Sequence, residues 1–526
     1  MKQFIVSLFL LFFTVILLAQ NNTSSLIPMP NKITHTKQKK CFNLQPKIFY
    51  YSNFPDSIFA FSQLKNTFSK YFPFIKLEKS HNENNAQIVI KKDAYFTNPQ
   101  AYKLEINKKG IIIQGCSEVA VLYGVITLDQ LLLGDVINTK NNKISPIIIE
   151  DSPRYNYRAL MLDPARNFLP VQDVKRYIHQ MMKFKYNVLQ LHLTDDQGWR
   201  VEIKSRPDLT KEGEYYTQEE LKDLVKYAAE RGIQIVPELD VPGHTVAVLA
   251  SYPEFGCSHT YEIPKVLGKT TNMMLCSNNE QVYGLYKDVI SEVAEIFPFE
   301  YIHLGGDESV IETNWAKCVK CKEKMEEKGY KQAKELMNYF FGRVLQYVKE
   351  CDKKAILWCE LDNIRMPANE YLFDYPKDVT LVTWRNGLTP KCIELSGRNG
   401  NNLIMAPGEY AYFDYPQYYN DFPEFDNWGM PITTLKKVYE FDPSYGLLYN
   451  QQSHIKGVMA TLWGEAIKNI NRAFYMTYPR GLAFAEAGWT NMENRNWESF
   501  KNRMYPIIIE MIKSGVNVRA PFEVAD

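Results

Sequence analysis

The segment YIHLGGDES occupies residues 301–309. Its first five residues have the apolar character of a short buried strand. Two glycines follow, and then Asp307 and Glu308 stand side by side. Adjacent carboxylates repel each other, and charge is most costly where a strand is buried. A fold that gathers its strand ends around a polar pocket would account for both features.

Seven other apolar segments of strand length occur between residues 159 and 463, and amphipathic helices separate them. The eight strand candidates are 159–163, 187–193, 233–239, 301–305, 355–360, 379–384, 402–406 and 457–463. Capping boxes are expected at Thr217/Glu220 and at Ser277/Glu280. Eight strands with helical crossovers predict an α/β protein built as a (β/α)8 TIM barrel. A doubly wound open sheet is the alternative, and the count of eight favours the barrel.

Residues 22–150 differ from this pattern. The expected strands are 48–51, 87–92, 102–107 and 110–115, and the expected helices are 57–72 and 119–133. These elements predict a small N-terminal α+β domain, which 146–155 joins to a catalytic barrel over 151–526.

The N-terminus has the layout of a secretory signal. Lys2 precedes an apolar run from Phe4 to Leu18, and Ala19 and Gln20 follow. This pattern is typical of a cleaved signal peptide, here residues 1–20, and the run is short for a membrane span. We expect the mature protein to be exported to the periplasm or the extracellular space, without stable membrane insertion.

The charge balance argues against polyanionic partners. Lys and Arg number 61 against 60 Asp and Glu, so no net field attracts a nucleic acid. Aromatic residues make up 13% of the chain, which suits either core packing or sugar stacking.

Cysteine usage leaves one motif to explain. Among nine cysteines, Cys318 and Cys321 form a C-x-x-C motif. Zinc would require a second ligand pair, and the sequence offers none at a familiar spacing. A local disulfide or free thiols is therefore favoured over metal, and no metal or cofactor is predicted.

Every expected strand ends in acidic or aromatic residues, where the chemistry of such barrels collects. In strand order these residues are Asp163; His192, Asp195 and Asp196; Glu238, Asp240 and His244; Asp307 and Glu308; Trp358 and Glu360; Trp384; Tyr412 and Asp414; and Trp463 and Glu465. Carboxylates that protonate a leaving oxygen, with indoles that hold a sugar face, indicate a glycosidase.

The motif HLGGDE, with MLDPAR, HLTDDQGWR, PELDVPGH and LWGE around it in this order, resembles glycoside hydrolase family 20, the β-N-acetylhexosaminidases. The resemblance covers about residues 25–500. It implies an exo-acting, retaining enzyme that removes terminal β-linked N-acetylglucosamine or N-acetylgalactosamine from oligosaccharides or glycans. In this family the substrate's own acetamido oxygen attacks C1 and forms an oxazolinium ion.

The resemblance also assigns roles to residues. Glu308 is the general acid and then the base, Asp307 orients the acetamido N–H and stabilises the oxazolinium, and Tyr412 bonds the acetamido oxygen. The substrate-binding residues would be Arg158, Asp195, His244, Trp358, Trp384, Asp414, Trp463 and Glu465. For Asp195 and His244, support of the catalytic acid and direct substrate contact both stay open.

The sequence departs from the family at one place. Many members have Arg-His after the first strand, whereas this chain has Arg166 and Asn167. Asn keeps a hydrogen-bond donor but cannot titrate.

Three other functions remain as alternatives. The acidic and histidine side chains could hold a metal in a deacetylase of N-acetyl sugars, although they form no compact H-x-x-x-H motif. The barrel could bind sugars without catalysis, although binding alone needs no protonated carboxyl group. It could also be a glycosidase with a carboxylate nucleophile, which would act on sugars without the acetamido group.

Overall fold

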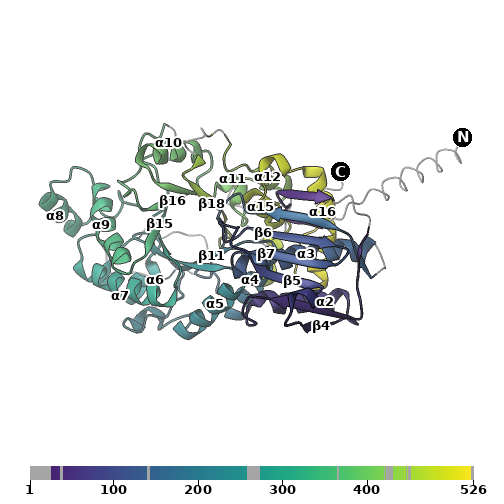
Figure 1. Cartoon of the computed structure of the whole chain (residues 1–526). Coiled ribbons are helices and arrows are strands. Elements are labelled where there is room, and N and C mark those ends of the chain that lie inside the picture. Colours follow the sequence, from purple (N-terminus) through teal and green to yellow (C-terminus); the bar gives the residue numbers. More distant parts are fainter. Residues whose placement is uncertain are drawn as a thin grey trace, which may run out of the picture. The chain divides into compact units, whose positions relative to one another are not determined.

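The computed structural model describes residues 25–35, 40–138, 142–257, 263, 273–363, 367–419, 421, 430–445, 447 and 452–522 (Figure 1). The predicted signal peptide lies outside these residues. Within them, no helix has both the length and the apolar character that a membrane crossing requires. The chain divides into two compact units. The first contains the chain up to Arg154 together with Trp489–Val516, and the second contains Tyr155–Gly488.

The first unit is built on a seven-stranded mixed sheet. Its strand order is β1 (Lys32–His35), β9 (Ile147–Asp151), β6 (Tyr102–Asn107), β7 (Gly110–Gly115), β5 (Ile88–Lys92), β3 (Lys47–Ser52) and β4 (Lys76–Lys79). Figure 1 shows β6, β7 and β5 side by side. Helices α2 (Phe59–Tyr71) and α3 (Glu118–Asn138) contact each other, and α3 covers β6 and β7. The predicted α+β domain is confirmed.

Three strands of this sheet are not predicted from the sequence. The edge strand β4 reads KLEK and β1 reads KITH, so neither has an apolar alternation to detect. β9 reads IIIED and pairs with both β1 and β6, although its segment was interpreted as a joint.

The C-terminal segment completes the first unit. Asp151, at the end of β9, accepts hydrogen bonds from the Tyr102 hydroxyl (2.8 Å) and from the indole Nε1 of Trp489 (3.0 Å to each oxygen). Helix α16 (Trp497–Lys513) follows, and its Glu510 forms an ion pair with Lys70 of α2 at 2.7 Å. We expected the barrel domain to run to residue 526, whereas Trp489–Val516 groups with the N-terminal sheet.

The second unit is a closed barrel of eight parallel strands. They are β10 (Tyr157–Leu162), β11 (Val188–Asp195), β13 (Gln234–Val241), β14 (Tyr301–Gly305), β15 (Lys354–Trp358), β16 (Thr380–Thr383), β17 (Asn402–Met405) and β18 (Ile455–Ala460). β10 pairs with β11 on one side and with β18 on the other, so the sheet has no open end. The barrel is confirmed, and the doubly wound sheet is excluded.

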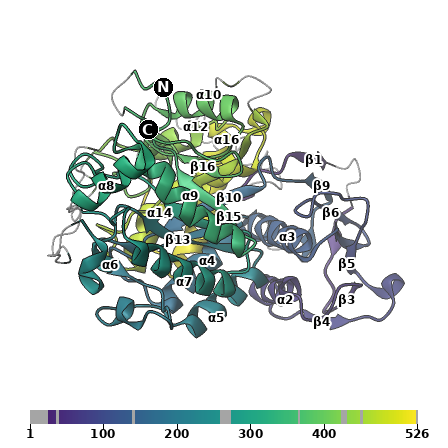
Figure 2. The ribbon, with the colours of Figure 1, turned by 90° about the vertical axis from the view of Figure 1, so that its left-hand side faces the viewer.

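Helices surround these strands, as Figure 2 shows for α5, α7 and α10. The main ones are α4 (Val171–Lys183), α5 (Gln218–Glu230), α7 (Glu280–Ile296), α9 (Glu335–Glu350), α10 (Thr389–Asn399), α14 (Ile470–Thr477) and α15 (Arg480–Trp489). Shorter helices follow strand ends: α6 (Val246–Ser251), α8 (Val319–Lys328), α11 (Gly408–Ala411) and α12 (Leu435–Glu440).

One of the two expected capping boxes is present. Thr217 and Glu220 form a reciprocal box at the start of α5. The box predicted at Ser277 is wrong, because α7 begins at Glu280 and its cap is Asn279, whose side chain accepts from the N–H of Gln281.

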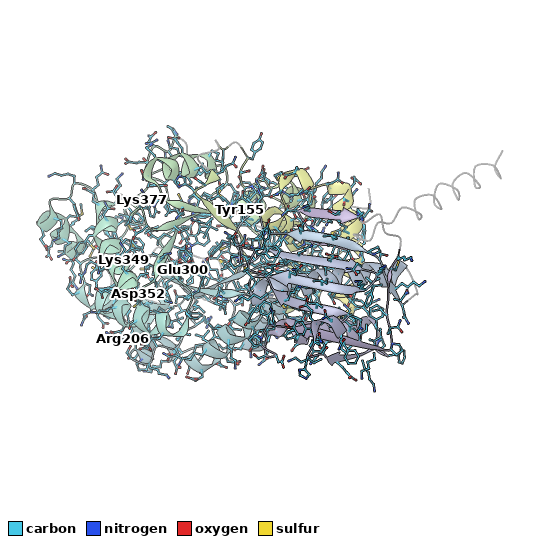
Figure 3. All side chains as sticks on the ribbon, viewed as in Figure 1. Tyr155, Arg206, Glu300, Lys349, Asp352 and Lys377 are labelled. Atoms are coloured by element: carbon cyan, nitrogen blue, oxygen red, sulfur yellow. The ribbon has the colours of Figure 1, made fainter. Side chains whose placement is uncertain are left out.

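The two ends of the barrel carry different residues. Figure 3 labels Glu300, Asp352 and Lys377, which precede β14, β15 and β16 and therefore mark the N-terminal end of the strands. There, Lys354 pairs with Glu300 at 2.5 Å. Since the strands are parallel, the predicted site residues that follow them gather at the opposite end.

Candidate active site

The turn after β14 positions the adjacent carboxylates. Gly305 and Gly306 have φ values of +65° and +92°, and Glu308 has φ +46°. A Cβ on Gly305 would lie 1.7 Å from the Asp240 carboxylate, so only glycine fits. The N–H of Gly306 donates to that carboxylate at 3.2 Å. The two glycines thus allow β14 to turn sharply against the end of β13.

Asp307 and Glu308 face different surroundings. Asp307 is buried, and burial together with the charge of Glu308 raises its pKa above the usual range, although His244 opposes this. The Glu308 side chain keeps 43% of its surface exposed. One carboxyl group therefore lies in the floor of the site, and the other reaches its open side.

A row of three ionisable side chains, His244, Asp195 and Arg166, lies beside this pair of carboxyl groups. The His244 Nε2 atom lies 3.8 Å from Asp307 and 3.7 Å from Glu308, and its Nδ1 atom lies 3.4 Å from Asp195. Arg166 binds Asp195 at 2.8 Å. Burial would lower the pKa of His244, but the carboxylates of Asp195, Asp240 and Asp307 together outweigh burial, and the pKa is raised well above the usual range. An imidazolium in this position stabilises negative charge on either neighbouring carboxylate.

Another carboxylate near this site, that of Glu238, is fully buried. Glu238 accepts from Gln190 (2.8 Å) and from the Trp358 indole (2.8 Å) and pairs with His192 at 2.9 Å. These donors satisfy a carboxylate that has no exposure to water. The hydrogen bond from the Trp358 indole to this carboxylate fixes the position of the ring.

Aromatic side chains form the walls. The Trp358 ring centroid lies 5.7 Å from that of Trp463 and 6.3 Å from that of Trp384, and Tyr412 lies 6.5 Å from Trp384 with nearly parallel planes. Arg385 covers the Trp384 ring at 4.0 Å. These faces leave an apolar slot beside the carboxylates.

The pocket itself has a volume of about 170 Å³. Its lining residues are Arg166, His244, Asp307, Glu308, Trp384, Tyr412, Asp414, Tyr415, Met430, Trp463, Glu465 and Ala466. Five buried polar atoms of its lining residues find no hydrogen-bond partner among the described residues: Arg166 Nε, His244 Nδ1, Asp307 Oδ1, the Tyr412 hydroxyl and Trp384 Nε1. Buried polar atoms are normally satisfied, so these point to a ligand.

Three more carboxyl groups lie around the pocket. Burial raises the pKa of Asp414 to about 8, with a further contribution from Glu465. Burial also raises the pKa of Glu465 against the effect of Arg166. Glu360 forms a two-point ion pair with Arg385 (3.0 and 3.1 Å), and burial still raises its pKa to about 7.

The structure places most of the predicted residues together. Those that line the pocket are Glu308, Asp307, Tyr412, His244, Trp384, Asp414, Trp463 and Glu465. Asp195 and Trp358 lie behind it and contact His244 and Trp463, respectively.

The prediction for Arg158 is wrong. This residue is second in β10, at the N-terminal end of the barrel, where its guanidinium donates to the carbonyls of Lys185 (2.9 Å) and Tyr155 (2.8 Å). The arginine in the pocket is Arg166, which lies after the C-terminal end of the same strand. Its position in MLDPAR, four residues past Leu162, was the signal to follow.

Asn167, the departure from the family pattern, is structural. Its side-chain N–H donates to the carbonyls of Gly464 (2.7 Å) and Glu465 (3.3 Å). It therefore ties the loop after β10 to the loop after β18, where Glu465 is placed. Arg385 and Tyr415 were not predicted either, because nothing in their local sequence distinguishes them.

A catalytic metal fits this pocket poorly. Three groups of acidic and histidine side chains each bring three ligand atoms within metal-binding reach: Asp195/Asp196/His244, His192/Glu238/Asp240 and Asp240/His244/Asp307. In the third group, Asp240 already accepts a hydrogen bond from the N–H of Gly306. The Arg166 guanidinium bonds Asp195 and approaches His192 Nε2 at 3.1 Å. A cation beside it would meet both electrostatic repulsion and ligands that are already occupied.

The barrel and its carboxylate-and-indole pocket define a glycoside hydrolase, and the comparisons with known proteins agree. The family model for the catalytic domain of glycosyl hydrolase family 20 matches residues 155–492, and the model for domain 2 of that family matches residues 23–152. The chain belongs to glycoside hydrolase family 20 and is a β-hexosaminidase.

Individual relatives support this. A β-hexosaminidase of Akkermansia muciniphila is 37% identical over 77% of this chain and 82% of its own length. One from Vibrio furnissii is 31% identical over 89% and 76%. A Vibrio harveyi exo-β-N-acetylglucosaminidase in complex with N-acetylglucosamine aligns with a TM-score of 0.80 at 27% identity, over 95% of this chain and 79% of that one. A Bacteroides fragilis β-N-acetylhexosaminidase aligns with a TM-score of 0.80 at 27% identity, over 94% and 97%.

Proposed function

We propose that this enzyme removes single terminal β-linked N-acetylglucosamine or N-acetylgalactosamine residues from oligosaccharides or glycans, with retention, through an oxazolinium intermediate. The exo action is supported by the small pocket, since about 170 Å³ suits one sugar unit rather than a chain. It is also supported by the exo-β-N-acetylglucosaminidase named above.

The observation that carries this proposal is a pair of unpartnered buried atoms. Asp307 Oδ1 is an acceptor, and the Tyr412 hydroxyl is a donor, and both line the same pocket. A secondary amide presents the complement of this pair, one N–H donor and one carbonyl acceptor. An acetamido group bound there satisfies both atoms, and its methyl lies against the indoles of the wall.

In the first step the acetamido oxygen attacks C1 while the C1–oxygen bond to the leaving group breaks. Glu308 gives its proton to the departing oxygen, because it is the carboxyl group that reaches the open side of the pocket. Asp307 holds the acetamido N–H and stabilises the positive charge that develops on the oxazolinium.

In the second step water attacks C1 from the side that the leaving group vacated. Glu308, now a carboxylate, takes the proton from that water. The bond between C1 and the acetamido oxygen breaks and the acetamide re-forms. Two inversions at C1 give net retention.

His244 and Asp195 assist without touching the reacting bond in this scheme. The imidazolium of His244 lies between Asp307 and Glu308, and Asp195 and Arg166 hold it there. Its charge stabilises Glu308 after proton loss. We therefore propose that His244 and Asp195 support the catalytic acid rather than bind the substrate directly.

The test compares an aryl N-acetyl-β-glucosaminide with an aryl β-glucoside, following aryl alcohol, acetate and the anomeric configuration of the sugar product. We expect cleavage of the N-acetyl substrate alone, the β-anomer as first product, and no acetate. Cleavage of both substrates would show a carboxylate nucleophile. Release of acetate would show a deacetylase, and no turnover with retained N-acetylglucosamine binding would show a sugar-binding protein.

Two variants test the proposed contacts of Asp307 and Tyr412 with the acetamido group. Asp307→Asn and Tyr412→Phe each remove one partner of the amide, and each should raise the barrier by about 2–4 kcal/mol. Tyr410→Phe is the matched control, because that ring stacks on Phe441 at 5.2 Å outside the pocket. A wild-type rate in Tyr412→Phe would contradict the proposed hydrogen bond from the Tyr412 hydroxyl to the acetamido oxygen.

Export of the enzyme is part of the same proposal. The N-terminal charged and apolar pattern supports cleavage near residue 20. Mass spectrometry of the N-terminus of protein recovered from periplasm or medium tests it, and an intact Met1 on cytoplasmic protein would contradict it.

A further inference from the structure

Four cysteines meet in the second unit, away from the sugar pocket. They are Cys257, Cys276, Cys318 and Cys321. Cys257 and Cys276 both lie between β13 and α7, Cys318 is the N-cap residue of α8, and Cys321 lies in the first turn of α8. The expectation that the C-x-x-C motif lacks a second ligand pair is wrong, because the fold supplies Cys257 and Cys276.

The sulfur positions have the geometry of a tetrahedron. Cys276 Sγ lies 3.7 Å from Cys321 Sγ and 4.0 Å from Cys318 Sγ, and Cys257 Sγ lies 3.8 Å from Cys321 Sγ. All four lie within 4.8 Å of one another. Zinc–thiolate bonds of about 2.3 Å in a tetrahedron place the sulfur atoms about 3.8 Å apart.

Two disulfides would give a different pattern. A disulfide brings two sulfur atoms to about 2.05 Å, so four cysteines would form two close pairs. Here Cys276 is nearly equidistant from Cys318 and Cys321, and all four are free thiols. A four-iron cluster would also differ, because each cysteine then binds a separate iron and the sulfur atoms lie farther apart.

We propose that Cys257, Cys276, Cys318 and Cys321 bind one structural zinc ion as four thiolates. The set is closed, with four protein ligands and no position left for water, as in structural rather than catalytic zinc sites. The proposal is independent of the glycosidase mechanism.

The surroundings suit bound thiolates. The Ser277 hydroxyl donates to Cys321 Sγ at 3.4 Å, the kind of outer hydrogen bond that orients a metal ligand. Cys318 and Cys321 stand at the N-terminus of α8, where the helix dipole favours negative charge. Cys276 and Cys321 are fully buried, whereas Cys257 and Cys318 are partly exposed and leave a path for the ion.

The zinc would join two loops that carry catalytic residues. Beside Cys276, the N–H of Leu275 donates to the Pro242 carbonyl (3.0 Å) in the turn that presents His244. The Trp315 indole, from the loop that follows Glu308, donates to the Leu275 carbonyl (2.7 Å). The ion therefore cross-links the loop after β13 to the loop after β14.

The first experiment measures metal in the full chain, purified without chelators or metal-affinity steps from medium that contains zinc. We expect one zinc per chain by elemental analysis and four sulfur ligands at about 2.3 Å by X-ray absorption. Recovery of these cysteines as disulfide-linked peptides would overturn the proposal. So would nitrogen or oxygen ligands, or a metal-free protein that takes up no added zinc.

Variants locate the site. Cys276→Ser and Cys321→Ser should each lose the zinc and lower the Tm, whereas Cys351→Ser, a thiol outside the cluster, should retain one zinc. Zinc retained in a Cys276→Ser/Cys321→Ser double variant would place the ion elsewhere. If these variants fail to fold, the absorption spectrum of the unchanged protein still decides the ligand set.

Discussion

At the scale of single residues, Asp307 and Glu308 share a peptide bond but not an environment. The turn at Gly305 and Gly306 directs one carboxyl group into the floor and the other toward the opening. Neighbouring positions can therefore serve neighbouring atoms of one substrate.

Glu308→Gln tests this division. Without a proton donor, turnover of substrates with poor leaving groups should fall by about 10²–10⁴-fold, while activated aryl leaving groups are affected less. Kinetics over a series of aryl leaving groups measures the difference. Glu312→Gln, an exposed carboxylate in the same loop, is the control. An equal loss for all leaving groups would contradict the role of general acid.

The raised pKa of Asp414 predicts how stability depends on pH. Between pH 4 and 8 the unfolded chain releases a proton that the folded protein still holds at this residue, since its folded pKa is about 8. The folded state then binds more protons, so its stability falls as pH rises through this window and levels off above pH 8.

In Asp414→Asn, stability should fall less steeply than in the wild type as the pH rises from 4 to 8. Urea midpoints at pH 5, 6, 7 and 8 measure it, with Asp378→Asn, an exposed carboxylate paired with Lys349, as control. A variant with the same pH slope as the wild type would show that Asp414 does not hold its proton in the folded protein.

Site residues could be predicted from the sequence where a motif directly follows a strand. They could not be predicted where the fold brings together residues that are distant in the sequence. Glu308, Tyr412 and Trp463 lie in the pocket as expected. Arg158 lies inside the first strand near its start and Arg166 follows its end, so the bounds of the strand decide which of the two faces the site. Cys257 and Cys276 join the C-x-x-C motif from 42 to 64 residues away, so their spacing resembles no common zinc motif.

At the scale of elements, the end of β14 depends on close approach to β13. Gly305→Ala would place a methyl group against the Asp240 carboxylate at a positive φ, so we expect loss of both stability and activity. Thermal unfolding and kcat/KM measure the two effects.

Gly284→Ala is the matched contrast. It lies within α7, nothing is within 4 Å of its added Cβ, and it should stabilise the helix by about 0.5–1 kcal/mol. A harmless Gly305→Ala would show that the turn can move away from Asp240.

Barrel strands could be predicted because they are buried on both faces and read as continuous apolar runs. All eight appear within three residues of their expected ends. Edge strands such as β4 could not be predicted in this way, because charged residues on their exposed faces interrupt the apolar pattern. The cap of α7 was misplaced because Ser277 and Glu280 match a capping box by spacing, while Asn279 is nearer to the helix start.

At the scale of the whole molecule, the first unit depends on residues from both ends of the chain. Trp489→Phe removes the indole donor to buried Asp151 and should destabilise that unit by about 1–3 kcal/mol. Hydrogen exchange should then speed up over residues 25–154 more than over residues 155–488. Trp497→Phe, in the first turn of α16, is the control. An equal increase of the hydrogen-exchange rate in both units would contradict the division of the chain into these two units.

This division also orders events during synthesis. The barrel segment Tyr155–Gly488 lies within the chain of the first unit, between its sheet and its last helix. At about 5–20 residues per second, a ribosome needs on the order of tens of seconds to pass from one part to the other. Throughout that interval the nascent sheet lacks α16 and the Trp489 contact to Asp151. It is in this interval that a holdase chaperone would have a surface to protect.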